Sequence, residues 1–297
     1  MEIVYGLIGI ILIIVFGLSV YIARKMFQPK TWTLEDSLAL ETEKNIIDFE
    51  SLKTHGIEPV SIHHNGLKLQ GEWIDNQSTK TLIFMHGHTY TLYGGYKYAS
   101  MFLNRGYNVL LPNQRYHGNS EGKYCTLGYL ESTDLHAWIA YVKTRIPQTK
   151  SLGLMGESMG GATVLMGGDH QAIDFIISDC AYSDFAKQSQ EVLWRRHKIP
   201  SFMIYPTALL ARLKYRIPLF KISPKTHIKS LKIPILLVHG DADDYIDVSH
   251  LHHLKAHSFN PPEVYICPNA NHAQSYETNP IQYEKVVHDF LLTHNFL

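Results

Sequence analysis

Short apolar runs alternate with longer segments of helical length and spacing through most of this chain, and no other feature limits the possible folds so strongly. Strands that alternate with helices form a mostly parallel sheet with helices on both faces, so we predict an α/β fold whose ligands bind at the carboxyl ends of the strands. The predicted strands are 81–85, 108–111, 152–155, 173–177, 233–238 and 264–267, and the predicted helices are 96–104, 129–144, 159–166, 248–257 and 281–292.

One domain, residues 55–297, accounts for this pattern, since a chain of 297 residues can bury one large core. The segments 57–63 and 67–74 alternate in polarity around Asn65-Gly66, which predicts a β-hairpin at its start. An apolar, proline-interrupted insertion at about residues 183–228 separates two predicted strands. Short helices that cap a site and helices that only pack on the core explain this insertion equally well.

The N-terminus carries a predicted transmembrane anchor, residues 1–27. Ile3–Ile22 contains no charge and would span about 30 Å as a helix, which matches the bilayer core. A cleaved secretory signal is the alternative, with a faint cleavage site at Gly17–Ser19, but no basic residue precedes the apolar run. Arg24, Lys25 and Lys30 follow the span, which predicts a single-pass protein of the cell membrane with its C-terminal domain on the cytoplasmic side.

Residues 28–54 are predicted to form a polar stalk, with a helix that begins at Thr33 and carries Glu35 and Asp36 in its first turn. The chain has 27 basic and 27 acidic residues, so its net charge does not favour a nucleic acid partner. We expect no cofactor, because no glycine-rich phosphate loop is present. We also expect no metal, although His250, His253 and His257 share a predicted surface helix.

A nucleophile is indicated at Ser158, in the G-x-S-x-G sequence Gly156–Gly160. In this motif the serine lies on a sharp turn between a strand and a helix, and the flanking glycines allow the close crossing. A second match surrounds Ser120, but that serine lies in a polar loop with no helix directly after it. Ser158 follows a predicted strand and precedes a small-residue helix, so we assign the nucleophile there.

A serine nucleophile requires a base and an orienting carboxylate, which follow it in the order Ser, Asp or Glu, His. His272 follows the last predicted strand and is the predicted base. Four acids follow the strand before it, and the chemistry alone does not choose between them: Asp241, Asp243, Asp244 and Asp247.

From about residue 57 to 297 the sequence resembles the α/β-hydrolase superfamily, in particular bacterial serine aminopeptidase-like and esterase-like hydrolases. The resemblance rests on the Ser158 motif, H-G-D-x-D at 239–243, N-H-A at 271–273 and His86-Gly87-His88-Thr89. It implies that Asp243 is the triad acid and His272 the triad base. It also implies that residues 86–89 form the oxyanion loop.

An oxyanion hole requires two backbone N–H donors, one from the residue after the nucleophile and one from that loop. Met159 supplies the first, and we favour His88 for the second, with Thr89 possible. Residues 112–122 resemble a further family loop but carry Asn113 where relatives have aspartate, so the charge partner of Arg115 is open. We interpret Arg115 and His117 as organising this loop.

The predicted function is a serine hydrolase that cleaves carboxylic esters through an acyl-enzyme on Ser158. Peptidase, amidase or acyltransferase activity with the same triad is the alternative within the enzyme class. A membrane-tethered binding module without activity is the alternative outside it. The expected partners are a small-molecule or lipid ester substrate and the membrane, which the N-terminal helix enters. Whether that helix selects lipid substrates or is a simple tether is open.

Overall fold

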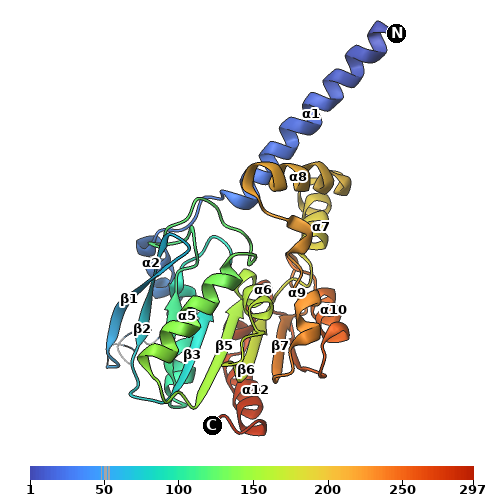
Figure 1. Cartoon of the computed structure of the whole chain (residues 1–297). Coiled ribbons are helices and arrows are strands. Elements are labelled where there is room, and N and C mark those ends of the chain that lie inside the picture. Colours follow the sequence, from blue (N-terminus) through green and yellow to red (C-terminus); the bar gives the residue numbers. More distant parts are fainter. Residues whose placement is uncertain (48, 50–51, 53) are drawn as a thin grey trace.

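The computed structural model describes residues 1–297 except 48, 50, 51 and 53, and its centre is one eight-stranded sheet (Figure 1). The strand order is β1-β2-β4-β3-β5-β6-β7-β8; the pairs β1–β2 and β2–β4 are antiparallel, and the five pairs that follow are parallel. The predicted α/β fold with a mostly parallel sheet is therefore confirmed. The strands are β1 (Ile57–His64), β2 (Leu67–Ile74), β3 (Lys80–Met85), β4 (Asn108–Pro112), β5 (Ser151–Glu157), β6 (Phe175–Asp179), β7 (Ile235–Gly240) and β8 (Glu263–Cys267).

The hairpin β1–β2 closes at Asn65 and Gly66, whose φ angles of 49° and 75° match the two-residue turn that Asn-Gly predicts. Two other strands begin later than predicted. β6 begins at Phe175 rather than 173, and β7 begins at Ile235 rather than 233. At β7 the reason is Pro234, which has no N–H to give to the sheet.

Helices cover both faces of the sheet, because successive side chains of each strand point to opposite sides. On β3, Leu82 and Phe84 join the core beneath α4 and α12, whereas Ile83 and Met85 join the core beneath α5, α6 and α10. The helices of these layers are α4 (Tyr96–Leu103), α5 (Glu131–Arg145), α6 (Met159–Met166), α10 (Ser249–His257) and α12 (Pro280–Thr293), with short helices η1 (Leu92–Gly95), η5 (Ile228–Ser230) and α11 (Ser275–Thr278).

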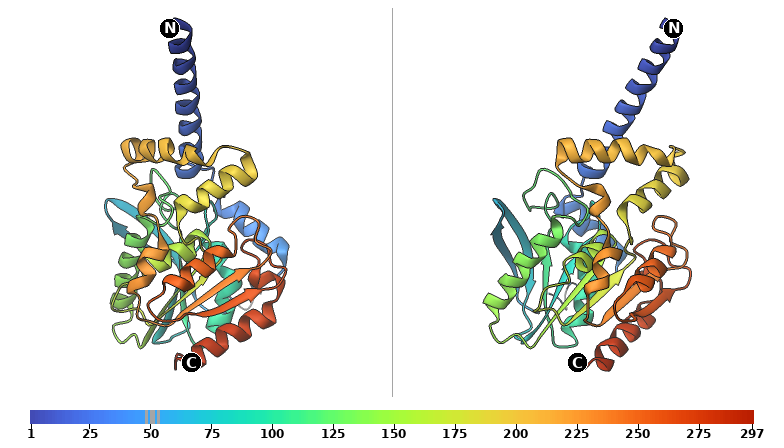
Figure 2. Two further views of the ribbon diagram at one scale, coloured as in Figure 1. Left: turned by 90° about the vertical axis from the view of Figure 1, so that its right-hand side faces the viewer. Right: turned by 45° about the vertical axis from the view of Figure 1, so that its right-hand side comes forward.

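The insertion between β6 and β7 lies at the end of the domain from which α1 projects (Figure 2). We refer to residues 183–228 as the cap. Its elements are α7 (Phe185–His197), η2 (Ser201–Met203), α8 (Ile204–Leu210), η3 (Ala211–Tyr215), η4 (Leu219–Lys221) and α9 (Pro224–His227).

The N-terminal helix α1 (Glu2–Phe27) is long and apolar enough to cross a membrane, with a mean hydropathy of 2.8 in its most apolar window. Most of it is exposed, but its last turns enter the domain. Ala23 and Phe27 are fully buried in the core, and the carbonyl of Phe27 accepts a hydrogen bond from the Cys125 N–H at 3.0 Å. The end of α1 is therefore part of the folded domain.

The segment predicted as a stalk is packed against the domain. Its helix α2 (Leu34–Lys44) begins as predicted, since the Thr33 hydroxyl accepts a hydrogen bond from the Asp36 N–H at 3.0 Å. Ser37 and Glu41 are buried, and the Ser37 hydroxyl lies 2.6 Å from that of Thr91. Positions 48, 50, 51 and 53 of the predicted stalk lie outside the described residues.

Candidate active site

Ser158 lies on a sharp turn between β5 and α6, with φ 56° and ψ −116°. Its N–H donates to the carbonyl of Asp179 at 2.8 Å, which holds the turn against the end of β6. The positions on either side of the turn have no room for a side chain, so they must be glycine. A Cβ on Gly160 would lie 1.8 Å from the Met85 carbonyl oxygen, and one on Gly156 would lie 2.3 Å from the Gly160 backbone. The two glycines thus allow the strained serine to sit at the crossing.

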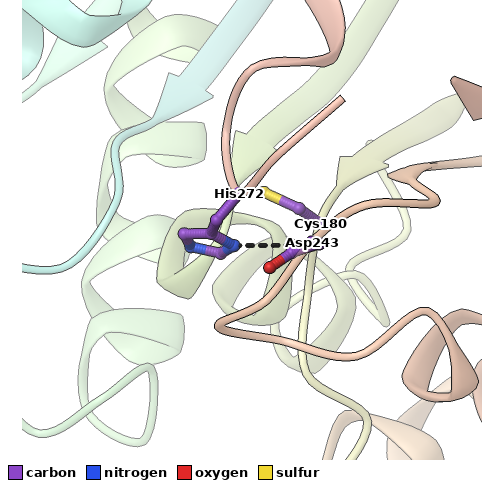
Figure 3. A group of neighbouring side chains, drawn as sticks. All are labelled: Cys180, Asp243 and His272. Atoms are coloured by element: carbon purple, nitrogen blue, oxygen red, sulfur yellow. Dashed lines mark hydrogen bonds and ion pairs between the residues drawn. The ribbon is translucent and has the colours of Figure 1, made fainter. Parts of the chain in front are cut away.

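Ser158 is the first member of a hydrogen-bonded chain of three side chains. Its Oγ lies 2.9 Å from His272 Nε2. His272 Nδ1 lies 2.7 Å from Asp243 Oδ2, the contact that Figure 3 marks with a dashed line. Asp243 follows β7 and His272 follows β8, and these strands are parallel neighbours whose carboxyl ends meet at one edge of the sheet. The sheet thus places the predicted base between the predicted nucleophile and one of the four acids.

The hydrogen bonds that Asp243 accepts keep its carboxylate ionised. Oδ1 accepts hydrogen bonds from the N–H groups of Tyr245 (2.9 Å) and Ile246 (2.8 Å), and Oδ2 lies 3.3 Å from His239 Nε2. Burial acts to raise the pKa of this carboxyl, but the hydrogen bonds from His239 and His272 outweigh burial and hold the pKa well below its usual range.

The other three acids have different partners. Asp241 accepts a hydrogen bond from the Asn269 N–H at 2.6 Å, and Asp244 pairs with Arg196 at 2.7 Å. Asp247 accepts from the Ser249 N–H at 2.9 Å, at the start of α10. Within the described part of the chain, Asp243 is the carboxylate that contacts His272.

The loop after β3 lies beside Ser158, since a Cβ on Gly87 would be 3.6 Å from the Ser158 Cβ. The N–H groups of His88 and Met159 have no hydrogen-bond partner among the described residues. The Thr89 N–H instead donates to His117 Nε2 at 3.2 Å. Of the two loop amides considered from the sequence, His88 is therefore the one that is available to a ligand.

Two buried histidines, His86 and His117, are neutral and hold this loop in place through hydrogen bonds. His86 Nδ1 donates to the Gly87 carbonyl at 2.8 Å, and its Nε2 accepts from the Gln114 N–H at 3.0 Å. Burial lowers the pKa of His86 to about 4 and that of His117 well below its ordinary value. A neutral ring can accept as well as donate, which these contacts require.

Residues 112–122 form a hydrogen-bonded loop, as the sequence suggested. The Arg115 guanidinium binds both oxygens of Asp134 on α5, each at 2.6 Å, so α5 supplies the charge partner that the asparagine at 113 does not. Asn113 Oδ1 accepts from the Leu92 N–H at 2.8 Å. The Ser120 hydroxyl donates to the Asn113 carbonyl at 2.7 Å, so this serine is a structural member of the loop.

Two residues near the site were not identified from the sequence. Lys97 on α4 binds Glu157 at 2.7 Å and donates to the Ala273 carbonyl at 3.2 Å. It thus joins the residue before Ser158 to the residue after His272. His239 lies 3.3 Å from Asp243, and its place at the end of β7 was the sequence signal that could have indicated it.

Cys180 lies beside Asp243 and His272, and the ligand atoms of the three lie within 4.8 Å of one another (Figure 3). Burial raises the pKa of the Cys180 thiol well above its ordinary value. His250, on the helix with His253 and His257, is buried rather than on the surface, and its Nδ1 accepts from the Ser183 N–H at 3.1 Å.

Two cavities meet at Ser158. One, of about 310 Å³, is mainly apolar and is walled by the end of α1, by α7 and by Met159. The other, of about 380 Å³, is called the polar cavity here because charged side chains line part of its wall, all of them in ion pairs: Glu41, Lys44, Lys97, Glu157 and Glu277. Lys44 lies 3.0 Å from both Glu41 and Glu277, and Lys97 lies 3.5 Å from Glu277. The site is therefore apolar on one side of the serine and polar on the other.

The parallel sheet, the serine turn and the strand-end positions of the acid and the histidine together define the α/β-hydrolase class of fold. The sequence model of the X-Pro dipeptidyl-peptidase (S15) family matches residues 52–205. The chain belongs to this family, within the α/β-hydrolase superfamily.

Relatives with and without solved structures extend the likeness to most of the chain. The uncharacterized protein YqkD of Bacillus subtilis is 32% identical over 295 residues, 96% of this chain and 95% of that protein. The Pyrococcus furiosus esterase Pf2001 is 26% identical, with a TM-score of 0.68 over 82% of this chain and 93% of that one. Est1E of Butyrivibrio proteoclasticus, solved with ferulic acid, shares the fold at 18% identity with a TM-score of 0.61 over 79% of this chain and 98% of that one.

Proposed function

We propose that this protein is a membrane-anchored serine hydrolase that cleaves carboxylic esters. The observation that carries the proposal is the chain of contacts from Ser158 Oγ to His272 Nε2 (2.9 Å) and from His272 Nδ1 to Asp243 Oδ2 (2.7 Å). These distances suit a nucleophile, its general base and an orienting carboxylate.

In the first step His272 Nε2 takes the Ser158 proton as Oγ bonds to the ester carbonyl carbon. Asp243 stabilises the imidazolium, and the N–H groups of His88 and Met159 donate to the oxyanion. The carbonyl then re-forms, the bond to the alcohol breaks, and His272 gives the alcohol its proton. Water, activated by His272, attacks the acyl-enzyme, releases the carboxylic acid and restores the Ser158 hydroxyl.

An ester is favoured over a peptide by the surroundings of the serine. The apolar cavity suits an acyl group, and the structurally similar Pf2001 is described as an esterase. The family description, X-Pro dipeptidyl-peptidase, supports peptidase activity as the second candidate. A dipeptidyl-peptidase must bind a free α-amino group, but Glu41, Glu157 and Glu277, the acids of the polar cavity, are already paired with Lys44 or Lys97.

The helix α1 is proposed to be the anchor, with the hydrolase domain on the cytoplasmic side. Its apolar length is sufficient, and Arg24 and Lys25 lie at its C-terminal end. Basic residues beside a span are retained on the cytoplasmic side of the membrane.

The test is labelling of the purified full-length protein with a fluorophosphonate, which modifies an activated serine. We expect labelling to be lost in Ser158→Ala and His272→Ala and to persist in Ser120→Ala, the matched control in the second G-x-S-x-G sequence. Wild type that stays unlabelled, or labelling that survives Ser158→Ala, refutes the mechanism. Turnover of p-nitrophenyl esters compared with X-Pro nitroanilides then separates esterase from dipeptidyl-peptidase.

A further inference from the structure

The cap carries a helix that is apolar on two sides. In the continuous helical segment α8–η3, residues 204, 207, 208, 211 and 215 are buried against the protein. The opposite side is equally apolar: Tyr205, Leu209 and Leu213 repeat every four residues and are 59%, 60% and 73% exposed. Phe202, one turn earlier, is also more than half exposed. A helix with apolar residues on both sides requires an apolar medium on its outer side.

The helix α1 identifies that medium. Residues 2–14 are free of the protein and span about 20 Å at about 1.5 Å per residue, which is short of a bilayer core of about 30 Å. To cross the membrane, α1 must therefore also use Val15, Leu18 and Ile22. These residues pack in one cluster with Leu193 and Met203 of the cap. The part of the cap beside them must then lie at the depth of the lipid.

The orientation of α8 agrees with this depth. α8 contacts α1 and lies across the base of its projecting part, in all three views (Figures 1 and 2). If α1 runs through the bilayer, α8 lies in the plane of its surface, as interfacial helices do.

The charge of the cap also suits a membrane surface. Residues 183–228 contain nine lysines and arginines and two acidic residues, whereas the whole chain has 27 of each kind. Arg212, Lys214 and Arg216, next to the exposed apolar stripe, have no ion-pair partner among the described residues. Cations next to an apolar stripe are attracted by the anionic headgroups of a cytoplasmic leaflet.

The apolar cavity extends from Ser158 to the contact between α1 and the cap. Its walls include Tyr21, Ile22 and Met26 of α1, together with Val192 and Leu193 of α7. The cavity is therefore walled by the residues that link α1 to the cap, at the level of the lipid. The polar cavity lies on the other side of the serine, where a polar alcohol could leave.

We propose that Phe202, Tyr205, Leu209 and Leu213 of the cap dock on the lipid bilayer beside α1, and that the apolar cavity takes the acyl chain of a lipid ester directly from that bilayer. This inference rests on the proposed ester hydrolase function. α1 is then a wall of the substrate site as well as an anchor.

The test uses the full-length protein in vesicles of phosphatidylcholine and phosphatidylglycerol. The double variant Leu209→Glu/Leu213→Glu is compared with Ile281→Glu/Leu292→Glu, which changes two exposed apolar residues of α12. Neither pair lines the cavities. We expect the cap variant to hydrolyse a long-chain diacylglycerol in the vesicle at least about tenfold more slowly, because a carboxylate in the interface weakens docking. Turnover of a soluble short-chain ester should be unchanged in both variants.

A second measurement does not depend on the charged cap variants. Vesicles with brominated acyl chains should quench the fluorescence of Trp194, which is 57% exposed on the cap, as seen from the difference between wild type and Trp194→Phe. Absence of this quenching, or equal vesicle hydrolysis by the cap and α12 variants, overturns the inference and indicates that the stripe binds a protein instead. The proposed function itself is refuted if the wild-type protein neither hydrolyses soluble esters nor reacts with the fluorophosphonate.

Discussion

Replacing Asp243 with asparagine tests the proposed triad at the position where four acids compete. Oδ1 accepts two backbone hydrogen bonds, from the Tyr245 and Ile246 N–H groups, so the asparagine must keep its oxygen there. Its NH₂ group then occupies the position of Oδ2 and donates to His272 Nδ1, 2.7 Å away in the wild type. His272 must in turn carry its proton on Nε2, where it can no longer accept the proton of Ser158.

The wrong tautomer removes the general base while leaving the geometry in place. We expect kcat for a soluble ester to fall on the order of 10⁴-fold, which corresponds to about 5.5 kcal/mol of transition-state stabilisation. Asp241→Asn and Asp244→Asn are the matched controls, because these acids contact Asn269 and Arg196 rather than His272. Their kcat should stay within about threefold of wild type, since neither change reaches the base.

Steady-state kinetics give these values, and thermal unfolding shows that each variant is folded. Retention of more than a tenth of wild-type kcat by Asp243→Asn would refute the reasoning. So would a larger loss in either control.

Three further changes follow from the packing of the site. Gly160→Ala should destabilise the protein by about 3 kcal/mol or more in urea unfolding, because its Cβ would overlap the Met85 carbonyl; an unchanged midpoint would contradict the structure. The folded pKa of His86 lies near 4, so the unfolded chain takes up a proton between pH 6.5 and 4 that the folded one does not. The contribution of His86 to stability is therefore complete above pH 6.5 and should fall by about 2 kcal/mol from pH 7 to pH 5, with a shallower dependence in His86→Gln. Deletion of residues 2–27 should abolish soluble-ester turnover, because it removes Phe27 from the core and α1 from the cavity wall, whereas deletion of residues 2–14 should preserve it; equal activity of both would make α1 a simple tether.

The sequence by itself determined the fold class and the positions from which the site is built. Short apolar strands alternate with helices, and parallel strands bring their carboxyl ends to one edge, so residues after strands were expected to converge. Ser158 Oγ and His272 Nε2 lie 2.9 Å apart, although 114 positions separate the two residues in the sequence. Local patterns suffice here because the path of a buried strand is decided by its own side chains.

The tertiary structure separated groups whose chemistry is alike in the sequence. Residue chemistry left the four acids after β7 equivalent, and the resemblance to known hydrolases pointed to Asp243. In the structure Asp243 Oδ2 lies 2.7 Å from Nδ1 of His272, which follows β8. The Thr89 amide is occupied because a histidine 28 residues later reaches it.

The N-terminal segments show the same limit. From the sequence, the anchor and the stalk were predicted to be separate from the domain. The polarity of a segment indicates whether it contacts water or an apolar medium. It does not indicate whether the apolar medium is lipid or another part of the same protein. In the folded protein Phe27 is buried in the core and α2 packs beside the site. α8 has apolar residues on two sides, and the sequence does not show which side faces the protein. The structure shows that one side is buried and that the other is exposed next to α1. Burial is a property of distant segments brought together, so it is decided by the fold as a whole.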